Sequence, residues 1–152
     1  MNKALFLDRD GTINIDTGYV HDPEHFVFID GIFDFCHNAL SNGFIIIIIT
    51  NQSGIERGYF TEADYQHTTK YMLDEFTRRN IAITDVLHCP SLTGPNRKPA
   101  PGLFLKAKEK YNIDMSSSIQ IGDKERDLSA GRNAGIGTNI LFTGIYPTFE
   151  NN

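Results

Sequence analysis

A run of isoleucines in the middle of the chain, residues 44–50 (FIIIIIT), constrains the fold more than any other feature of the sequence. A strand that is apolar at every position must be buried on both of its faces. Parallel sheets with helices packed on both sides provide that environment. The run therefore predicts a central strand of a parallel sheet covered by helices.

Weaker apolar runs at residues 3–7, 83–88, 118–121 and 138–142 predict four further strands. Segments with helical spacing lie between them. The first carries Ile32, Phe35, Cys36 and Leu40 on one face and ends at Asn42-Gly43, and the second opens at Thr61 and carries Tyr65, Met72, Leu73 and Phe76. The third opens at Pro101 and carries Leu103, Phe104, Ala107 and Tyr111, and the fourth runs from about Glu125 to Ala134. This alternation predicts an α/β fold, a Rossmann-like three-layer sandwich with a mainly parallel sheet.

The 152 residues fit one domain, residues 1–152, and their net charge of −5 gives no electrostatic reason to bind nucleic acid or an anionic membrane. The longest apolar run is far shorter than the ~20 residues that span a bilayer. The N-terminus lacks the apolar stretch of a signal peptide. Because Cys36 and Cys89 make no disulfide framework, we expect a cytoplasmic protein, whose oligomeric state the sequence leaves open.

Polar motifs follow the first two predicted strands. DRDGT places Asp8 and Asp10 just past a strand, and Gly11 lets the chain turn away. Two carboxylates this close repel each other unless a cation shares them or one binds a proton; the alternative is an Asx-rich turn in which Thr12 caps a helix. TNQSG offers the Thr50 hydroxyl, two amides and several backbone N–H groups, which either hold an oxyanion or form an ordinary turn.

Two more motifs follow later strands. RKP, residues 97–99, places two cations near a predicted helix N-terminus, where anions are favoured, although a solvated basic turn is the alternative. GDKERD places Asp123 just past a strand and Asp127 one helical turn further on, with helix capping as the alternative. The carboxyl ends of parallel strands meet at one sheet edge, so we expect all four motifs to converge there.

The convergence predicts a phosphoryl-binding site. Asp8, Asp10 and Asp123 together favour a hard cation, Mg²⁺ by default. Lys98 and the Thr50 hydroxyl are expected to face that cation. A phosphoryl group fits between them.

These motifs make the chain similar to the haloacid dehalogenase (HAD) superfamily of aspartate-nucleophile phosphotransferases. Within it, the chain most resembles the D-glycero-D-manno-heptose 1,7-bisphosphate phosphatase and histidinol-phosphatase subfamily, over residues 4–142. The stretches that carry this resemblance are FLDRDGTIN, DTGYVHDPEHFVFIDG, TNQSGIERGYFTE, RKPAPG and IGDKERD. The resemblance implies a Mg²⁺-dependent hydrolase of phosphomonoesters in carbohydrate metabolism, acting on a small phosphorylated sugar of heptose biosynthesis. Histidinol phosphate is the alternative substrate. A nucleic-acid 3′-phosphatase and a non-catalytic binding protein are more distant alternatives.

Carried over to this sequence, the superfamily motifs make Asp8 the nucleophile and a metal ligand. Asp10 becomes the general acid and base, which must hold a proton for part of the time and which binds the metal through its backbone carbonyl. Thr50 and Lys98 hold the transferring phosphoryl oxygens. Asp123 completes the metal site.

The resemblance also implies supporting and substrate-binding residues. Asp127 is expected behind the metal ligands. The residues that match substrate-contacting positions are Asp16, Gly18, Tyr19, Asn51, Ser53, Arg97 and Lys124. The connectors are too short for a large cap domain, so we expect residues 16–22 and 91–98 to discriminate between substrates. Arg97 and Lys124 favour a doubly anionic substrate.

Two departures from the subfamily matter. The heptose enzymes commonly carry a zinc loop, but here Ser91 stands where a histidine is expected and residues 91–96 contain no cysteine, so we expect no structural zinc. We interpret His88 and Cys89 as buried strand-end residues. The chain also ends soon after Phe142, where relatives continue, and we expect an exposed sheet edge there or one that a partner chain covers.

Overall fold

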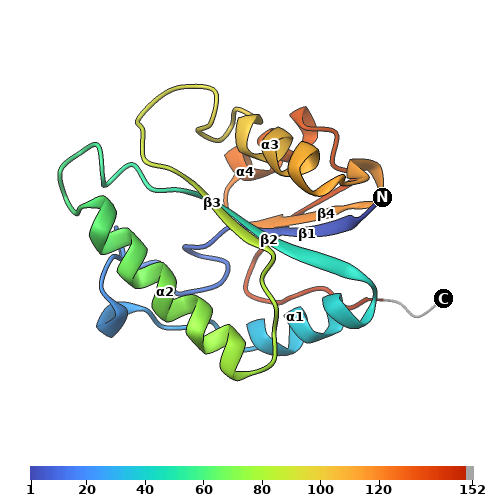
Figure 1. Ribbon diagram of the computed structural model, residues 1–152, viewed down its shortest axis with the longest axis horizontal. Helices are drawn as coiled ribbons and strands as arrows, with labels where there is room; N and C mark the ends of the chain where they lie inside the picture. The colour runs from blue at the N-terminus through green and yellow to red at the C-terminus, as the bar shows by residue number, and fades with distance from the viewer. Residues whose placement is uncertain (150–152) are drawn as a thin grey trace.

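The computed structural model describes residues 1–149, which form a five-stranded parallel sheet between two layers of helices (Figure 1). The strands are β1 (Lys3–Leu7), β2 (Phe44–Asn51), β3 (Asp85–Cys89), β4 (Ile119–Gly122) and β5 (Thr138–Leu141). They lie in the order β3-β2-β1-β4-β5, and every neighbouring pair is parallel. The predicted Rossmann-like sandwich with a parallel sheet is confirmed, and no cap domain interrupts residues 1–149.

Four α-helices and two short 3₁₀ helices connect the strands. They are α1 (Ile32–Ser41), α2 (Glu62–Arg78), α3 (Gly102–Tyr111) and α4 (Glu125–Asn133), with η1 (Pro23–His25) and η2 (Met115–Ser117). Figure 1 shows α1 and α2 on one face of the sheet and α3 and α4 on the other. The apolar side chains of the strands point alternately to the two faces of the sheet, and each face is covered by two helices.

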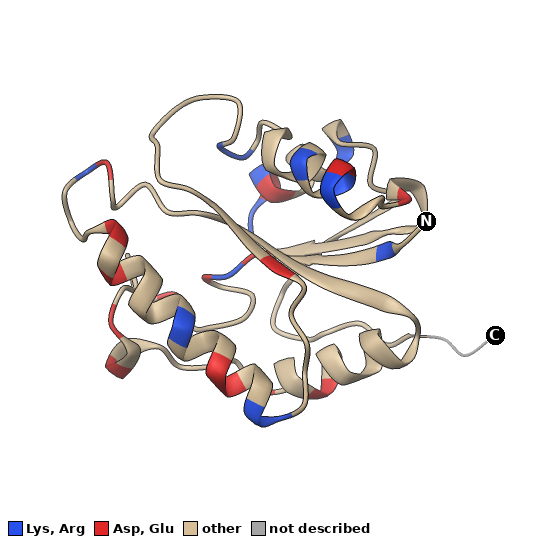
Figure 2. Cartoon of the chain, viewed as in Figure 1, with Lys and Arg blue, Asp and Glu red and all other residues tan. Residues whose placement is uncertain are grey.

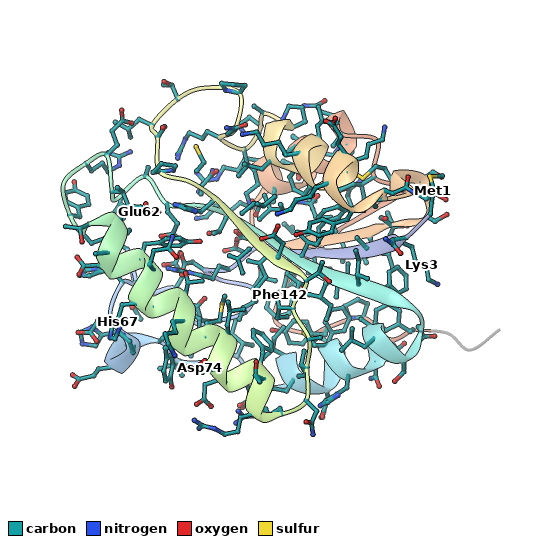
Figure 3. The ribbon with its side chains drawn as sticks, viewed as in Figure 1. Met1, Lys3, Glu62, His67, Asp74 and Phe142 are labelled. Carbon is teal, nitrogen blue, oxygen red and sulfur yellow. The ribbon has the colours of Figure 1, made fainter. Side chains whose placement is uncertain are left out.

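The isoleucine strand serves two cores at once. Ile46 and Ile48 pack into the core beneath α1 and α2, whereas Ile47 and Ile49 pack into the core beneath α3 and α4. Successive residues of a strand point to opposite faces, so an unbroken apolar run can be buried only between two helical layers. Figure 3 shows side chains filling the space on both sides of the sheet, with Glu62, His67 and Asp74 on the exposed side of α2.

The helix boundaries follow local chemistry. The Thr61 hydroxyl accepts a hydrogen bond from the Asp64 N–H at 3.1 Å, and the Asp64 carboxylate accepts one from the Thr61 N–H at 2.9 Å, a capping box that starts α2. Asn42 ends α1, and Gly43 follows with a φ of +85°. Pro101 directly precedes α3, and α4 ends at Asn133. The sequence predicted these boundaries to within one or two residues.

Charged residues gather on the helices and loops around a sheet that carries few of them (Figure 2). Within residues 1–149, no helix has the length and apolar character needed to cross a membrane.

Candidate active site

The four sequence motifs meet in one pocket at the carboxyl ends of the strands. The chain runs from β1 to β2 and β3 on one side and then returns to β4 and β5 on the other, so β1 and β4 flank the point where the strand order reverses. A pocket of about 320 Å³ opens at this edge. It is lined by Asp8, Asp10, Asp16, Gly18, Tyr19, Thr50, Asn51, Gln52, Ser53, Arg57, Arg97, Lys98, Lys124, Arg126 and Asp127.

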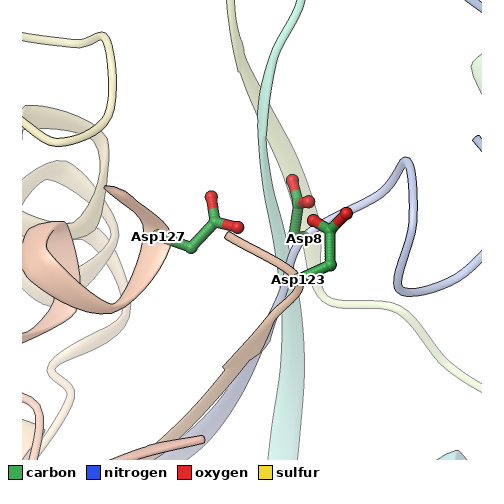
Figure 4. Close-up of side chains that lie close together, drawn as sticks. All are labelled: Asp8, Asp123 and Asp127. Carbon is green, nitrogen blue, oxygen red and sulfur yellow. The ribbon is translucent and has the colours of Figure 1, made fainter. Parts of the chain in front are cut away.

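Three carboxylates gather beside this pocket. Asp8 follows β1, Asp123 follows β4, and Asp127 lies in the first turn of α4; one oxygen of each lies within 4.8 Å of the others (Figure 4). The loop after β1 passes so close that a Cβ on Gly11 would lie 2.1 Å from Asp123 Oδ2. Glycine is required there for that approach and for its φ of +86°.

Lys98 pairs with two carboxylates of this cluster. Its ammonium lies 3.0 Å from Asp8 Oδ1 and 2.8 Å from Asp127 Oδ1, and it also donates a hydrogen bond to the carbonyl of Ile49 at 2.8 Å. The Lys98 side chain is only 2% exposed. A buried ammonium with three oxygen partners is held in one geometry, in contrast to the solvated basic turn that the sequence left open.

Burial and charge oppose each other within this cluster. Burial raises the pKa of Asp8 well above its usual value, the Lys98 ammonium lowers it, and the negative charge of Asp127 raises it again. For Lys98, burial lowers the pKa, but attraction to Asp8 and Asp127 outweighs burial, so the net shift is upward. Lys98 therefore stays charged and holds two carboxylates close together.

The carboxyl group of Asp10 lies apart from this cluster. Its oxygens accept hydrogen bonds from the Arg9 guanidinium at 3.0 and 3.1 Å, from Asn14 at 2.9 Å and from Gln52 at 3.1 Å. The close group of carboxylates among the described residues is therefore Asp8, Asp123 and Asp127, whereas four donors hold the Asp10 side chain in another direction. The expectation that Asp10 binds a metal through its backbone carbonyl does not depend on that side chain and stays a prediction.

Side-chain amides fix the end of β2 and the start of the loop that follows it. Thr50 is buried, and its hydroxyl accepts a hydrogen bond from Gln52 at 2.9 Å. The Asn51 side chain bonds the backbone of Lys98 twice, donating to its carbonyl at 3.2 Å and accepting from its N–H at 3.1 Å. Asn51, expected as a substrate contact, therefore also positions the segment that carries Lys98.

Further pocket residues come from the loops after β1 and β2. Asp16 accepts a hydrogen bond from the Gly18 N–H at 2.9 Å, which shapes the turn that presents Tyr19. The Tyr19 ring packs edge-on against Tyr59 with ring centroids 4.8 Å apart. Ser53 accepts a hydrogen bond from the Arg57 Nε at 3.3 Å. Of the expected discriminating segment 91–98, only Arg97 and Lys98 line the pocket.

The structure also decides the local alternatives at these motifs. Thr12 is buried and caps no helix, since the next helix along the chain is η1. Asp127, and not Asp123, takes part in capping α4: its carboxylate accepts a hydrogen bond from the Lys124 N–H at 3.1 Å. Cys89 is buried at the end of β3, as expected, whereas His88 is half-buried and pairs with Glu62.

Three pocket residues were not singled out from the sequence: Gln52, Arg57 and Arg126. All three lie inside or next to motifs that were recognised, TNQSG and GDKERD. Their position just past β2 and β4 was therefore a usable signal. What the sequence lacked was the direction of each side chain: Gln52 and Arg57 lie in a loop, which has no periodicity that assigns residues to a face, and Arg126 lies in the first turn of α4, where the placement of the helix decides what the side chain meets.

Comparison with known proteins places this site in a family. The HAD-hydrolase-like family model matches residues 95–150. The chain is 52% identical over 140 residues to a D-glycero-alpha-D-manno-heptose-1,7-bisphosphate 7-phosphatase of Campylobacter jejuni, covering 91% of this chain and 81% of that protein. A D-glycero-beta-D-manno-heptose-1,7-bisphosphate 7-phosphatase of Yersinia pestis is 43% identical over 148 residues, covering 91% of this chain and 79% of that protein.

A solved structure agrees with this similarity. The D,D-heptose 1,7-bisphosphate phosphatase from B. bronchiseptica, complexed with magnesium and phosphate, superimposes with a TM-score of 0.83 at 26% identity, covering 90% of this chain and 78% of that one. The expected resemblance is confirmed over nearly the whole chain.

Proposed function

The chain belongs to the heptose bisphosphate phosphatase family of the HAD superfamily and is a phosphatase, and from that premise we propose that it removes the C7 phosphate of D-glycero-D-manno-heptose 1,7-bisphosphate. The observation that carries the proposal is the buried Lys98, fixed between Asp8 and Asp127 beside Asp123. This arrangement places one cation and three carboxylates at the inner end of a pocket whose outer wall is basic. It suits a substrate with one phosphate to transfer and a second to hold.

The residues present fit Mg²⁺. Asp8, Asp123 and Asp127 offer oxygens within 4.8 Å of one another, and hard divalent cations prefer oxygen donors. Asp123 Oδ1 is buried and has no hydrogen-bond partner among residues 1–149, which leaves an acceptor free for a cation. We propose that Asp8, Asp123 and the Asp10 backbone carbonyl hold Mg²⁺. When bound, the ion supplies positive charge that offsets the repulsion between a carboxylate and a phosphate dianion.

Asp8 is placed to act as the nucleophile. We propose that its carboxylate attacks phosphorus in line, forming an aspartyl-phosphate while the bond from phosphorus to the sugar oxygen breaks. Lys98, already 3.0 Å from Asp8, neutralises charge on the equatorial phosphoryl oxygens, and the Thr50 hydroxyl and nearby backbone N–H groups hold the same oxygens.

Asp10 is proposed to handle the protons. In the first step its carboxyl proton passes to the departing sugar oxygen, and in the second step its carboxylate takes a proton from the water that cleaves the aspartyl-phosphate. Asp8 and Asp10 line the same pocket, which supports the proposal that Asp10 reaches a substrate bound at Asp8. Water as the phosphoryl acceptor agrees with the phosphatase family.

The outer wall favours a second phosphate. Arg57, Arg97, Lys124 and Arg126 line the same pocket beyond the buried Lys98. One transferring phosphoryl group does not require four further cations, whereas a bisphosphate brings another dianion to the pocket. Histidinol phosphate has a cationic amine in place of that second phosphate, and these cations would repel it.

The proposal is tested by measuring kcat/KM with Mg²⁺ for both anomers of the heptose 1,7-bisphosphate, histidinol phosphate, p-nitrophenyl phosphate and an oligonucleotide 3′-phosphate. We expect the heptose bisphosphate to be the best substrate and C7 to be the position cleaved, as phosphorus NMR of the product will show. Asp8→Asn controls for contaminating phosphatase. A higher kcat/KM for histidinol phosphate or for the oligonucleotide would overturn the assignment.

A further inference from the structure

Arg9, the residue between the two motif aspartates, has no part in the chemistry described so far. Its side chain is fully buried and is the largest fully buried side chain in the described chain. Burying a guanidinium costs free energy unless partners satisfy it, so the identity of those partners shows what Arg9 is there to hold.

One partner is Asp10. Arg9 Nε lies 3.0 Å from Asp10 Oδ1 and Nη2 lies 3.1 Å from Oδ2, a two-point pairing that fixes the plane of the carboxyl group. Asn14 and Gln52 add one amide hydrogen bond each. Among these donors only Arg9 contacts both oxygens, so it sets the orientation of Asp10.

The second partner lies on the loop that is expected to contact the sugar. Arg9 Nη2 also donates a hydrogen bond to the carbonyl of Val20 at 2.6 Å. Val20 is buried and directly follows Asp16, Gly18 and Tyr19, and we call residues 16–20 the recognition loop. Nη1 has no hydrogen-bond partner within the described part of the chain, so the side-chain pairing of Arg9 is directed at Asp10 and this loop.

Aromatic rings hold the guanidinium in place. The rings of Phe26 and Tyr65 lie against it, with centroids 5.8 and 6.0 Å from Cζ. The backbone carbonyl of Arg9 accepts hydrogen bonds from the N–H groups of Thr12 and Ile13 at 3.1 and 2.8 Å, which ties the turn to the same residue. Arg9 is therefore held in one position, and it fixes Asp10 relative to the backbone of Val20.

We propose that Arg9 is a positioning residue that fixes Asp10 relative to the recognition loop, so that a sugar bound by the loop meets Asp10 in the orientation needed for proton transfer. This inference rests on the proposed role of Asp10. In the step concerned, the bond from Asp8 to phosphorus forms, the bond from phosphorus to the sugar oxygen breaks, and the Asp10 proton moves to that oxygen. Lysine keeps the charge but lacks the planar fork, so it cannot fix the carboxyl plane and the loop together.

The test compares two leaving groups in Arg9→Lys. A sugar alkoxide leaves poorly without a proton, whereas p-nitrophenolate leaves readily without one, so only the sugar substrate depends on a well-placed Asp10. In single-turnover experiments, which isolate the first step, we expect release of heptose 1-phosphate from the bisphosphate to slow about 10²-fold. The release of p-nitrophenolate will slow far less. An equal loss on both substrates would mean a purely structural role and would overturn the proposal.

Controls separate this inference from its premises. Arg79→Lys, on the exposed end of α2 where Arg79 pairs with Glu75, alters an arginine remote from the pocket and should change neither rate. If Arg9→Lys does not fold, Phe26→Leu loosens the guanidinium without removing it and must show the same selective loss, smaller in size; an unchanged rate ratio then overturns the proposal. Failure of the wild-type protein to cleave the heptose bisphosphate would instead overturn the proposed function.

Discussion

Replacing Lys98 by methionine should make the metal-free protein unstable at alkaline pH. Lys98 is 2% exposed and is paired with Asp8 and Asp127 at 3.0 and 2.8 Å. Methionine has a similar length, so the change removes the charge and leaves two buried carboxylates without a cation. Removing one partner of a buried ion pair costs about 3–5 kcal/mol, and we expect the free energy of unfolding to fall by that amount at pH 8.

The loss should depend on pH, and its sign follows from Asp8. Burial raises the pKa of Asp8 in the folded state, so ionising Asp8 opposes folding at any pH above its ordinary value of about 3.9. Lys98 is the main group that lowers this pKa, so the variant raises it further and the penalty at pH 8 grows. As the pH falls toward 5, the Asp8 carboxylate of the variant binds a proton and the penalty shrinks. The Lys98 ammonium, with its raised pKa, stays charged throughout this range.

The assay is urea unfolding in EDTA at pH 8 and pH 5, with the denaturant slope used to check that both proteins unfold in the same way. Lys70→Met is the matched control, because Lys70 forms an exposed pair with Asp74 on α2 that is worth about 0.3–0.5 kcal/mol. Equal stability of Lys98→Met and wild type at pH 8 would refute the reasoning, and so would a deficit that grows as the pH falls.

Four further predictions concern the site and the fold. Asp8→Asn should abolish turnover while keeping a cooperative thermal transition, because it removes the nucleophile together with a buried like charge; residual activity within a few-fold of wild type would exclude Asp8 as the nucleophile. EDTA should stop phosphate release and Mg²⁺ alone should restore it, and elemental analysis showing stoichiometric tightly bound zinc would contradict the expectation that none is needed. Arg97→Ala and Lys124→Ala should lower kcat/KM for the heptose bisphosphate far more than for p-nitrophenyl phosphate, because binding of the remote phosphate assists the reacting one; equal losses would show that these cations serve only the transferred group. Thr61→Ala should lower the free energy of unfolding by about 1 kcal/mol through loss of the α2 cap, measured by urea unfolding, and an unchanged midpoint would mean that the cap is not needed.

Much of the fold was predictable because apolar residues recur along the sequence with the spacing of the buried face of a strand or helix. The unbroken isoleucine run of β2 requires a helical layer on each side, and the structure divides its side chains between two cores as expected. Parallel strands bring their carboxyl ends to one edge, so the order of the motifs along the chain was enough to gather Asp8, Thr50, Lys98 and Asp127 in one pocket.

The contacts of the side chains around the pocket were decided only by tertiary structure. Nothing in the spacing of DRDGT indicates that Asp10 turns toward Arg9 while Asp127, more than a hundred residues away, joins Asp8 beside Lys98. Asn51 likewise bonds the Lys98 backbone 47 residues further along the chain. The repeat of a strand or helix assigns a side chain to a face, whereas its partners at the end of a strand, in a loop or in the first turn of a helix are donors and acceptors that distant elements bring beside it.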